Sequence, residues 1–133
     1  MNVPSKELQT LKAEFFQALA HPIRIRLLEV LSSAGEQNVQ SLQQRLGIDQ
    51  PIVSQQLAKL RASGIVVTRK EGTTVLYAIA DPLLADLLKV AKDILNRRLV
   101  GTQALLRELQ RDQHVTRRRS TASDQRRNRR IDR

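Results

Sequence analysis

The spacing of apolar residues predicts four short helices in the first half of the chain. Within each segment, apolar side chains recur every three or four residues, as they do on the buried face of an amphipathic helix. Proline in a first turn, and glycine or serine just beyond a last turn, mark where helices begin and end. The predicted helices cover residues 5–20, 22–33, 39–46 and 51–63.

The third and fourth predicted helices are joined by a turn of about four residues that contains Gly47. Glycine at this position suits the left-handed conformation that commonly closes a helix. Two short helices with such a connection have the spacing of a helix-turn-helix unit. After Gly64 the pattern becomes strand-like, because segments 65–70 and 74–79 are rich in β-branched residues and flank a turn at Gly72. These segments predict a β-hairpin.

A last helix follows the hairpin. Asp81 suits its N-cap and Pro82 its first turn, and the helix would run to about residue 112, with Gly101 as the place where it would break. The predicted fold is therefore mainly α with a small β-hairpin, a winged helix-turn-helix of order α-α-α-α-β-β-α. In such folds the second helix of the helix-turn-helix enters the DNA major groove.

Length and composition narrow the function. The chain has 133 residues, enough for one small domain, and a formal net charge of +10. That charge points to a polyanionic partner, most often nucleic acid and less often an anionic membrane surface. The absence of cysteine excludes a disulfide framework, a thiolate zinc site and thiol redox sensing, and favours a cytoplasmic protein. Its charge-free stretches are far shorter than the roughly 20 apolar residues that span a bilayer.

The charge is concentrated at the C-terminal end. Residues 115–133 contain eight Arg and two Asp, a net charge of +6, and almost no apolar side chains. Such a segment cannot bury enough surface to offset the entropy of ordering, so we expect a winged-helix domain at 1–112 and a disordered Arg-rich tail at 113–133. The tail is equally well explained as a solvated extension or as a nonspecific contact to phosphates.

The predicted helix 51–63 offers candidate base contacts. Val53, Leu57 and Leu60 line its core-facing side. Glutamine can pair bidentately with adenine, serine can bind bases or phosphates, and small residues permit close approach. The opposite face of the helix and its preceding residue present Gln50, Pro51, Ser54, Gln55, Ala58 and Arg61. Ordinary solvated positions are the alternative interpretation of this set.

Basic residues elsewhere suit phosphate contacts. The hairpin carries two cations and a hydroxyl around a glycine at its tip: Arg69, Lys70, Gly72 and Thr73. Arg24 and Arg26 on the second predicted helix could also contact the DNA backbone, or could pair with a carboxylate of the same chain.

Three segments together resemble the ArsR/SmtB-type winged-helix repressors: LAHPIRIRLL at 19–28, QPIVSQQL at 50–57 and RKEG at 69–72. The resemblance covers about residues 8–100. It implies a dimeric bacterial or archaeal transcription regulator, usually a repressor, with DNA and a second copy of itself as partners. It also implies that Gln50, Pro51, Ser54 and Gln55 contact bases, that the tip near Gly72 contacts the backbone, and that the first and last helices form the dimer.

The last helix independently supports a homodimer. Its apolar residues form a stripe that is wider than one small core requires, and exposing that stripe would be costly. A second copy is the simplest cover, although burial within one chain is the alternative. The expected interface residues are Leu8, Leu11, Phe15, Leu84, Leu87, Leu88, Ala91 and Leu95.

Metal sensing and catalysis are not expected. Many proteins of the resembled family bind metal through Cys-x-Cys before the recognition helix, whereas this chain has Asn38 and Gln40 there. His21 lies at a helix junction, where capping or packing is the favoured role, and His114 lies near the tail. We therefore expect no metal and no cofactor, and the effector stays unidentified.

Motifs for phosphate-binding loops, nucleophile elbows and zinc proteases are missing from the sequence, so an enzyme is not expected. We expect a sequence-specific, dimeric transcriptional repressor that binds a palindromic operator. The alternative is a nonspecific nucleic-acid or ribosome-associated basic protein that holds RNA through its Arg-rich tail.

Overall fold

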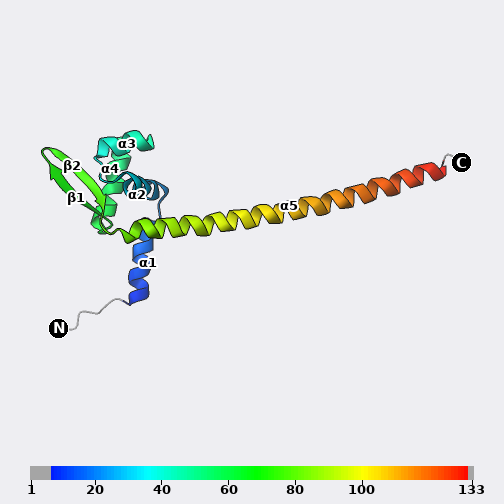
Figure 1. Ribbon diagram of the computed structural model, residues 1–133, viewed down its shortest axis with the longest axis horizontal. Helices are drawn as coiled ribbons and strands as arrows, with labels where there is room; N and C mark the ends of the chain where they lie inside the picture. Colours follow the sequence, from blue (N-terminus) through cyan, green and yellow to red (C-terminus); the bar gives the residue numbers. More distant parts are fainter. Residues whose placement is uncertain (1–6, 132–133) are drawn as a thin grey trace. The chain divides into compact units, whose positions relative to one another are not determined.

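The computed structural model describes residues 7–131, with the side chains of residues 7–113. Its element order is α-α-α-α-β-β-α, as predicted, and Figure 1 shows the elements along the chain. The chain divides into two compact units, Met1–Lys89 and Val90–Arg133. The elements are α1 (Leu8–Leu19), α2 (Pro22–Ala34), α3 (Val39–Leu46), α4 (Gln50–Ala62), β1 (Val66–Glu71), β2 (Thr74–Ile79) and α5 (Leu83–Ile131).

The predicted caps are present. His21 is the N-cap residue of α2, where its Nδ1 accepts a hydrogen bond from the Ile23 backbone N–H at 3.1 Å. Asp81 accepts one from the Leu83 N–H at 2.9 Å, ahead of α5. Gly47 closes α3 with a φ of 63°, in the left-handed region. Capping, the favoured role for His21, is thereby confirmed, while the predicted helix start at Pro4 and Ser5 lies outside the described residues.

The last helix differs from its prediction. α5 passes through Gly101 without a break and continues beyond residue 112 to Ile131, into the segment expected to be disordered. One glycine costs a helix only about 1 kcal/mol relative to alanine, which good helix formers on both sides tolerate. No proline follows Pro82 in the sequence, and arginine, a good helix former, is the commonest residue after position 112. Residues 132 and 133 lie outside the described part.

The core of the first unit joins all four short helices to the hairpin. Leu27, Leu28, Leu42, Leu57 and Leu60 are fully buried, with an exposed fraction of 0%. The other buried apolar residues are Leu19, Leu31, Val53, Ile65, Val66 and Leu84. Figure 1 shows α2, α3 and α4 grouped together. Because these helices meet around the buried side chains, the polar face of α4 is held in a fixed orientation on the surface of the unit.

The hairpin forms a two-stranded antiparallel sheet. Its register runs from Val66 opposite Ile79 to Glu71 opposite Thr74, which leaves a two-residue turn. Gly72, the first residue of that turn, has a φ of 62°, as a type II′ turn requires. On its other side, Tyr77 of β2 makes an antiparallel bridge with Gln37, in the loop between α2 and α3.

The second unit is the remainder of α5. The apolar residues identified as exposed in this unit each expose more than half of their surface: Val90, Ile94, Leu95, Leu99, Val100, Leu105, Leu106 and Leu109. Despite this apolar content, none of the helices in the described part of the chain combines the length and the hydropathy needed to cross a membrane.

Candidate nucleic-acid interface

The fourth helix presents a polar face because its apolar residues occupy the opposite side. Val53, Leu57 and Leu60 are fully buried against α2 and α3. Pro51 lies in the first turn, where its missing N–H leaves no helix bond unmade. The core thus fixes both the position of α4 and its rotation about its own axis.

The predicted base-contact residues lie together on this exposed side. Gln50, Pro51, Gln55, Ala58 and Arg61 are exposed, and Ser54 is half-buried. At about 100° per residue, the six positions fall within an arc of about 140°, and the buried residues Val53, Leu57 and Leu60 all lie outside that arc, with Leu57 next to its edge. The structure therefore brings these six residues onto one surface, as a groove-reading helix needs.

Two further polar residues of α4, Gln56 and Lys59, were not among the predicted contacts. Gln56 is the buried polar residue of α4, 6% exposed, and its Oε1 has no hydrogen-bond partner among the described residues. Lys59 is exposed on α4 and adds a cation at the edge of the polar face. The sequence could have predicted this position for Lys59, because Lys59 lies one helical turn after Gln55.

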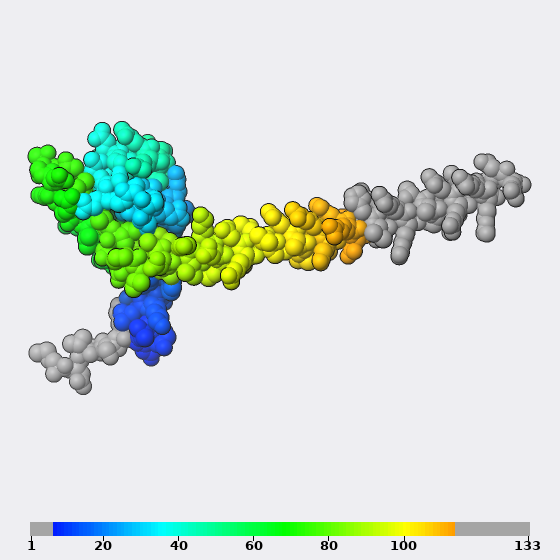
Figure 2. Space-filling model, viewed as in Figure 1, coloured from blue at the N-terminus to red at the C-terminus, as the bar shows by residue number. Residues whose placement is uncertain are grey.

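The hairpin residues around the turn are also exposed. Lys70, Gly72 and Thr73 lie at or near the two-residue turn, and all three residues are exposed. In Figure 2 the hairpin, in green, stands beside the cyan surface of the α3 region. Such a tip is accessible to a DNA backbone next to the groove that α4 would enter.

Arg69 is engaged within the protein. Its Nε lies 2.8 and 2.9 Å from the two carboxylate oxygens of Glu36, and its Nη2 lies 2.7 Å from Glu36 Oε2. Glu71 Oε2 is 3.5 Å from the same Nη2. These hydrogen bonds and the Arg69 charge lower the pKa of the Glu36 carboxyl, and Glu36 raises the pKa of Arg69. The guanidinium that was predicted to contact DNA phosphate is thus already paired.

Two further arginines bind backbone carbonyls. Arg24 Nη1 donates to the Ala18 carbonyl at 2.8 Å, and Arg26 Nη2 donates to the Leu46 carbonyl at 2.9 Å. The Leu46 carbonyl belongs to the last turn of α3, where a cation also offsets the helix dipole. The sequence suggested either a phosphate contact or a carboxylate partner for these arginines. In the structure each of them instead donates to a backbone carbonyl of its own chain.

The predicted dimer residues divide into two groups. Leu84 is buried in the core of its own chain, 6% exposed, and Leu87 and Leu88 pack partly against that core. Leu8, Leu11 and Phe15 on α1 and Ala91 and Leu95 on α5 are exposed. The exposed residues of the second group lie on α1 in the first unit and on α5 in the second unit.

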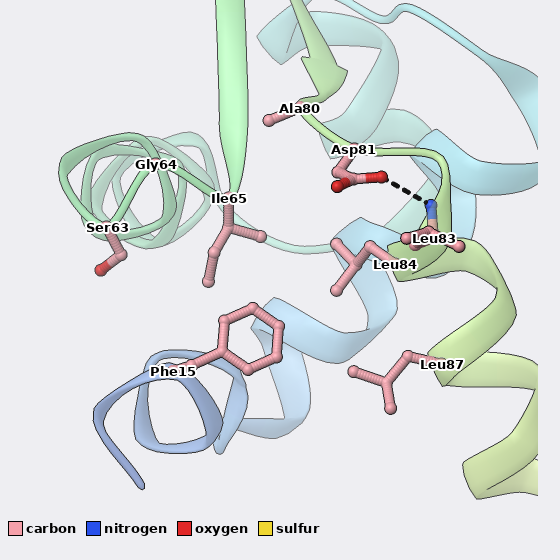
Figure 3. Close-up of a pocket in the computed structure, with 9 residues that line it drawn as sticks. All are labelled: Phe15, Ser63, Gly64, Ile65, Ala80, Asp81, Leu83, Leu84 and Leu87. Atoms are coloured by element: carbon pink, nitrogen blue, oxygen red, sulfur yellow. Dashed lines mark hydrogen bonds between the residues drawn. The ribbon is translucent and has the colours of Figure 1, made fainter. Parts of the chain in front are cut away.

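An apolar pocket of about 420 Å³ opens between α1, the end of α4 and the beginning of α5. In Figure 3 the Phe15 ring projects from α1 and lines the pocket, near Ile65 and facing Leu87. Asp81 is at the rim, with its carboxylate bound to the Leu83 N–H. The pocket therefore adjoins the exposed face of α1 within the first unit.

Asn38, one of the two residues that stand where the resembled family carries Cys-x-Cys, has a structural role. The Asn38 side chain is the N-cap of α3, where Oδ1 accepts a hydrogen bond from the Ser41 N–H at 2.7 Å. Among the described residues, no group of three His, Asp or Glu side chains is placed to hold a metal ion. Asn38 thus stabilises the start of α3.

A helix-turn-helix with an exposed polar second helix, followed by a hairpin, defines a winged helix-turn-helix protein. The family model described as "Bacterial regulatory protein, arsR family" matches residues 21–68. The uncharacterized HTH-type transcriptional regulator Rv0081 of Mycobacterium tuberculosis is 43% identical over 105 residues, which is 79% of this chain and 92% of that protein. The chain belongs to the ArsR family and is a DNA-binding transcriptional regulator.

Solved structures and a further relative agree with this assignment. The crystal structure of Rv0081 matches with a TM-score of 0.65 and 44% identity, over 73% of this chain and 97% of that one. The transcriptional repressor BigR from Xylella fastidiosa matches with a TM-score of 0.59 and 37% identity, over 65% and 87%. The biofilm growth-associated repressor of Xylella fastidiosa is 41% identical over 57% of this chain and 66% of its own length. The family and these relatives are regulators, not enzymes.

Proposed function

We propose that the protein is a repressor that works as a homodimer and reads each half of a palindromic operator with α4. The polar face of α4 carries the proposal, because uncharged side chains that can distinguish bases lie together on an otherwise well-packed helix. The relatives named as repressors support repression rather than activation. Lys70 and Thr73 would contact the backbone beside the groove, and no enzymatic activity is proposed.

The dimer rests on exposed apolar surface. Leu11 and Phe15 on α1 are 48% and 40% exposed, and Leu95 on α5 is 55% exposed. Leu95 and Leu106 are 11 residues apart, close to three helical turns, so they share one side of α5. Covering such side chains contributes about 25 cal/mol per Å² of apolar area, and a twofold axis presents the same faces to each other. Residues 1–112 would therefore hold both the DNA-binding and the dimerisation surfaces.

Binding to selected DNA tests this function. Fragments of the source genome that the purified protein retains at moderate salt should share a palindrome with half-sites about 10 bp apart, or a multiple of that. Equal binding to those fragments and to random duplexes of the same length would overturn the sequence-specific proposal.

The alternative, a nonspecific nucleic-acid-binding protein, has one observation in its favour. Residues 115–133 hold +6 of the total charge of +10. If this segment were the binding element, its removal would abolish most of the affinity and most of the salt dependence. If α4 reads the operator, the preference for the operator survives the deletion.

A further inference from the structure

The wing is attached to the rest of the first unit at a short loop. Residues 35–38 connect α2 to α3, and they contact the hairpin by side chain and by backbone. Glu36 binds Arg69 of β1 through the three hydrogen bonds described above, at 2.7 to 2.9 Å. The next residue, Gln37, exchanges two backbone bonds with Tyr77 of β2, at 3.1 and 2.8 Å. Both strands of the wing are therefore held by neighbouring residues of one loop.

The same loop is fixed to the helix-turn-helix. Asn38 caps α3 by accepting from the Ser41 N–H, and the Ser41 hydroxyl donates to Gln37 Oε1 at 2.5 Å. Gln37 Nε2 in turn donates to the Ala34 carbonyl at the end of α2, at 3.2 Å. A continuous set of hydrogen bonds thus runs from the hairpin through the loop to the start of α3. The third helix packs on α4.

The geometry of the Glu36–Arg69 ion pair is suited to fixing the direction of the hairpin. The planar Arg69 fork meets the planar Glu36 carboxylate through two nitrogens, an arrangement that fixes direction as well as distance. An isolated two-stranded hairpin is marginally stable in water, so its direction depends on such attachments. Lysine could not reproduce this contact, because its ammonium is a point charge without a fork.

The pair also engages the charge of Arg69 within the protein. The Glu36 and Glu71 carboxylates lie 2.7 and 3.5 Å from Arg69 Nη2. A phosphate could engage the Arg69 guanidinium only by displacing the Glu36 carboxylate.

We propose that Glu36 and Arg69 are positioning residues, which hold the wing in fixed register with α4 so that the tip and the reading helix contact DNA together. Arg69 acts through the wing and does not bind a phosphate. This inference rests on the proposed function, and it replaces the expectation that Arg69 is a backbone contact.

Neutral substitution of either partner separates the two roles of Arg69. If the pair positions the wing, Glu36→Gln and Arg69→Met each weaken operator binding by about two- to fivefold, the range expected for an exposed ion pair. If Arg69 binds phosphate, Arg69→Met weakens binding but Glu36→Gln strengthens it, because the guanidinium is released. Stronger binding by Glu36→Gln would overturn the proposal.

Salt dependence and a charge reversal provide independent readouts. Arg69→Met should leave the slope of log affinity against log salt unchanged, whereas the matched neighbour Lys70→Met should reduce it by about 1. The double variant E36R/R69E keeps the net charge and should recover part of the affinity lost in each single charge reversal. A slope reduced by Arg69→Met, or no recovery in the double variant, would contradict positioning.

Hydrogen exchange in the free protein separates this inference from the proposed function. In Arg69→Met, the backbone amides paired across β1 and β2 should exchange about two- to fivefold faster, while those of α2 and α4 stay unchanged. This result does not depend on DNA, so it stands even if operator binding fails. Unchanged exchange in the hairpin would show that the pair does not hold the wing.

Discussion

Replacing the polar side chains of the reading helix should remove discrimination without removing binding. In the double variant Ser54→Ala/Gln55→Ala, both changes lie on the exposed side of α4 and leave its buried leucines in place. Alanine is the best helix former, so the helix itself is retained. Neither residue carries charge, so the contribution of phosphate contacts to binding is unchanged.

The size of the effect follows from the groups removed. The exposed amide of Gln55 offers one donor side and one acceptor, enough for a bidentate pair with adenine. Such a pair contributes about 1–3 kcal/mol of discrimination, or about 5- to 150-fold for each half-site. Ser54 is half-buried and can add a single, weaker bond. The operator affinity of the variant should therefore approach that of the wild-type protein on random DNA.

Fluorescence anisotropy with an operator duplex and a scrambled duplex measures the specific and the nonspecific affinity in one titration series. Gln44→Ala is the matched control, because Gln44 is an exposed glutamine on α3 rather than on α4. It should keep discrimination intact. If the double variant still distinguished the two duplexes as well as the wild type does, the assignment of the reading face would be wrong.

Four further outcomes are expected. Deleting residues 113–133 should lower the overall affinity for DNA and the dependence of that affinity on salt in band-shift titrations, but the preference for the operator should remain. Loss of that preference would favour the nonspecific alternative. Leu95→Lys should give monomers in sedimentation equilibrium, because it places a charge on the exposed apolar face of α5. The control variant Asn96→Lys, at an exposed neighbouring position, should stay dimeric. A dimeric Leu95→Lys would show that this face of α5 is not the dimer interface. Gln56→Met should raise the urea unfolding free energy by about 1 kcal/mol, because the buried Oε1 has no partner among the described residues, and a decrease would reveal one. The ion pair lowers the pKa of the Glu36 carboxyl, so the pair stabilises the folded protein above pH 4.5 and this stabilisation is lost as the pH falls below 4.5. The difference in unfolding free energy between wild type and Glu36→Gln should therefore narrow at low pH. A difference that does not depend on pH would contradict the ion pair.

The elements were predictable where local chemistry defines them. Pro22, Pro51 and Gly47 mark helix boundaries by restricting or freeing the backbone, and the structure begins or ends helices at or beside each of them. His21 caps its helix for the same local reason. The exposed polar face of α4 was predictable as well, because the apolar residues of α4 determine which side is left for solvent.

The sequence did not predict interactions between distant segments. Glu36 and Arg69 are 33 residues apart, and nothing in either local sequence indicates that they meet. An apolar stripe also does not show which of its residues the chain buries within itself. Leu84 and Leu95 share one side of α5 by spacing, yet Leu84 is 6% exposed and Leu95 is 55% exposed. Tertiary packing makes that distinction.

Asn38 links the start of α3 to the wing. Its side chain caps α3, and replacing a good N-cap residue costs about 1 kcal/mol. The cap holds Ser41, whose hydroxyl holds Gln37, which bridges Tyr77 in the wing. A thiolate in place of Asn38 would lack the amide oxygen that accepts from the Ser41 N–H, so introducing Cys at positions 38 and 40 would loosen the loop to which the wing is attached. The loop thus links the wing to α3 by hydrogen bonds that need no metal.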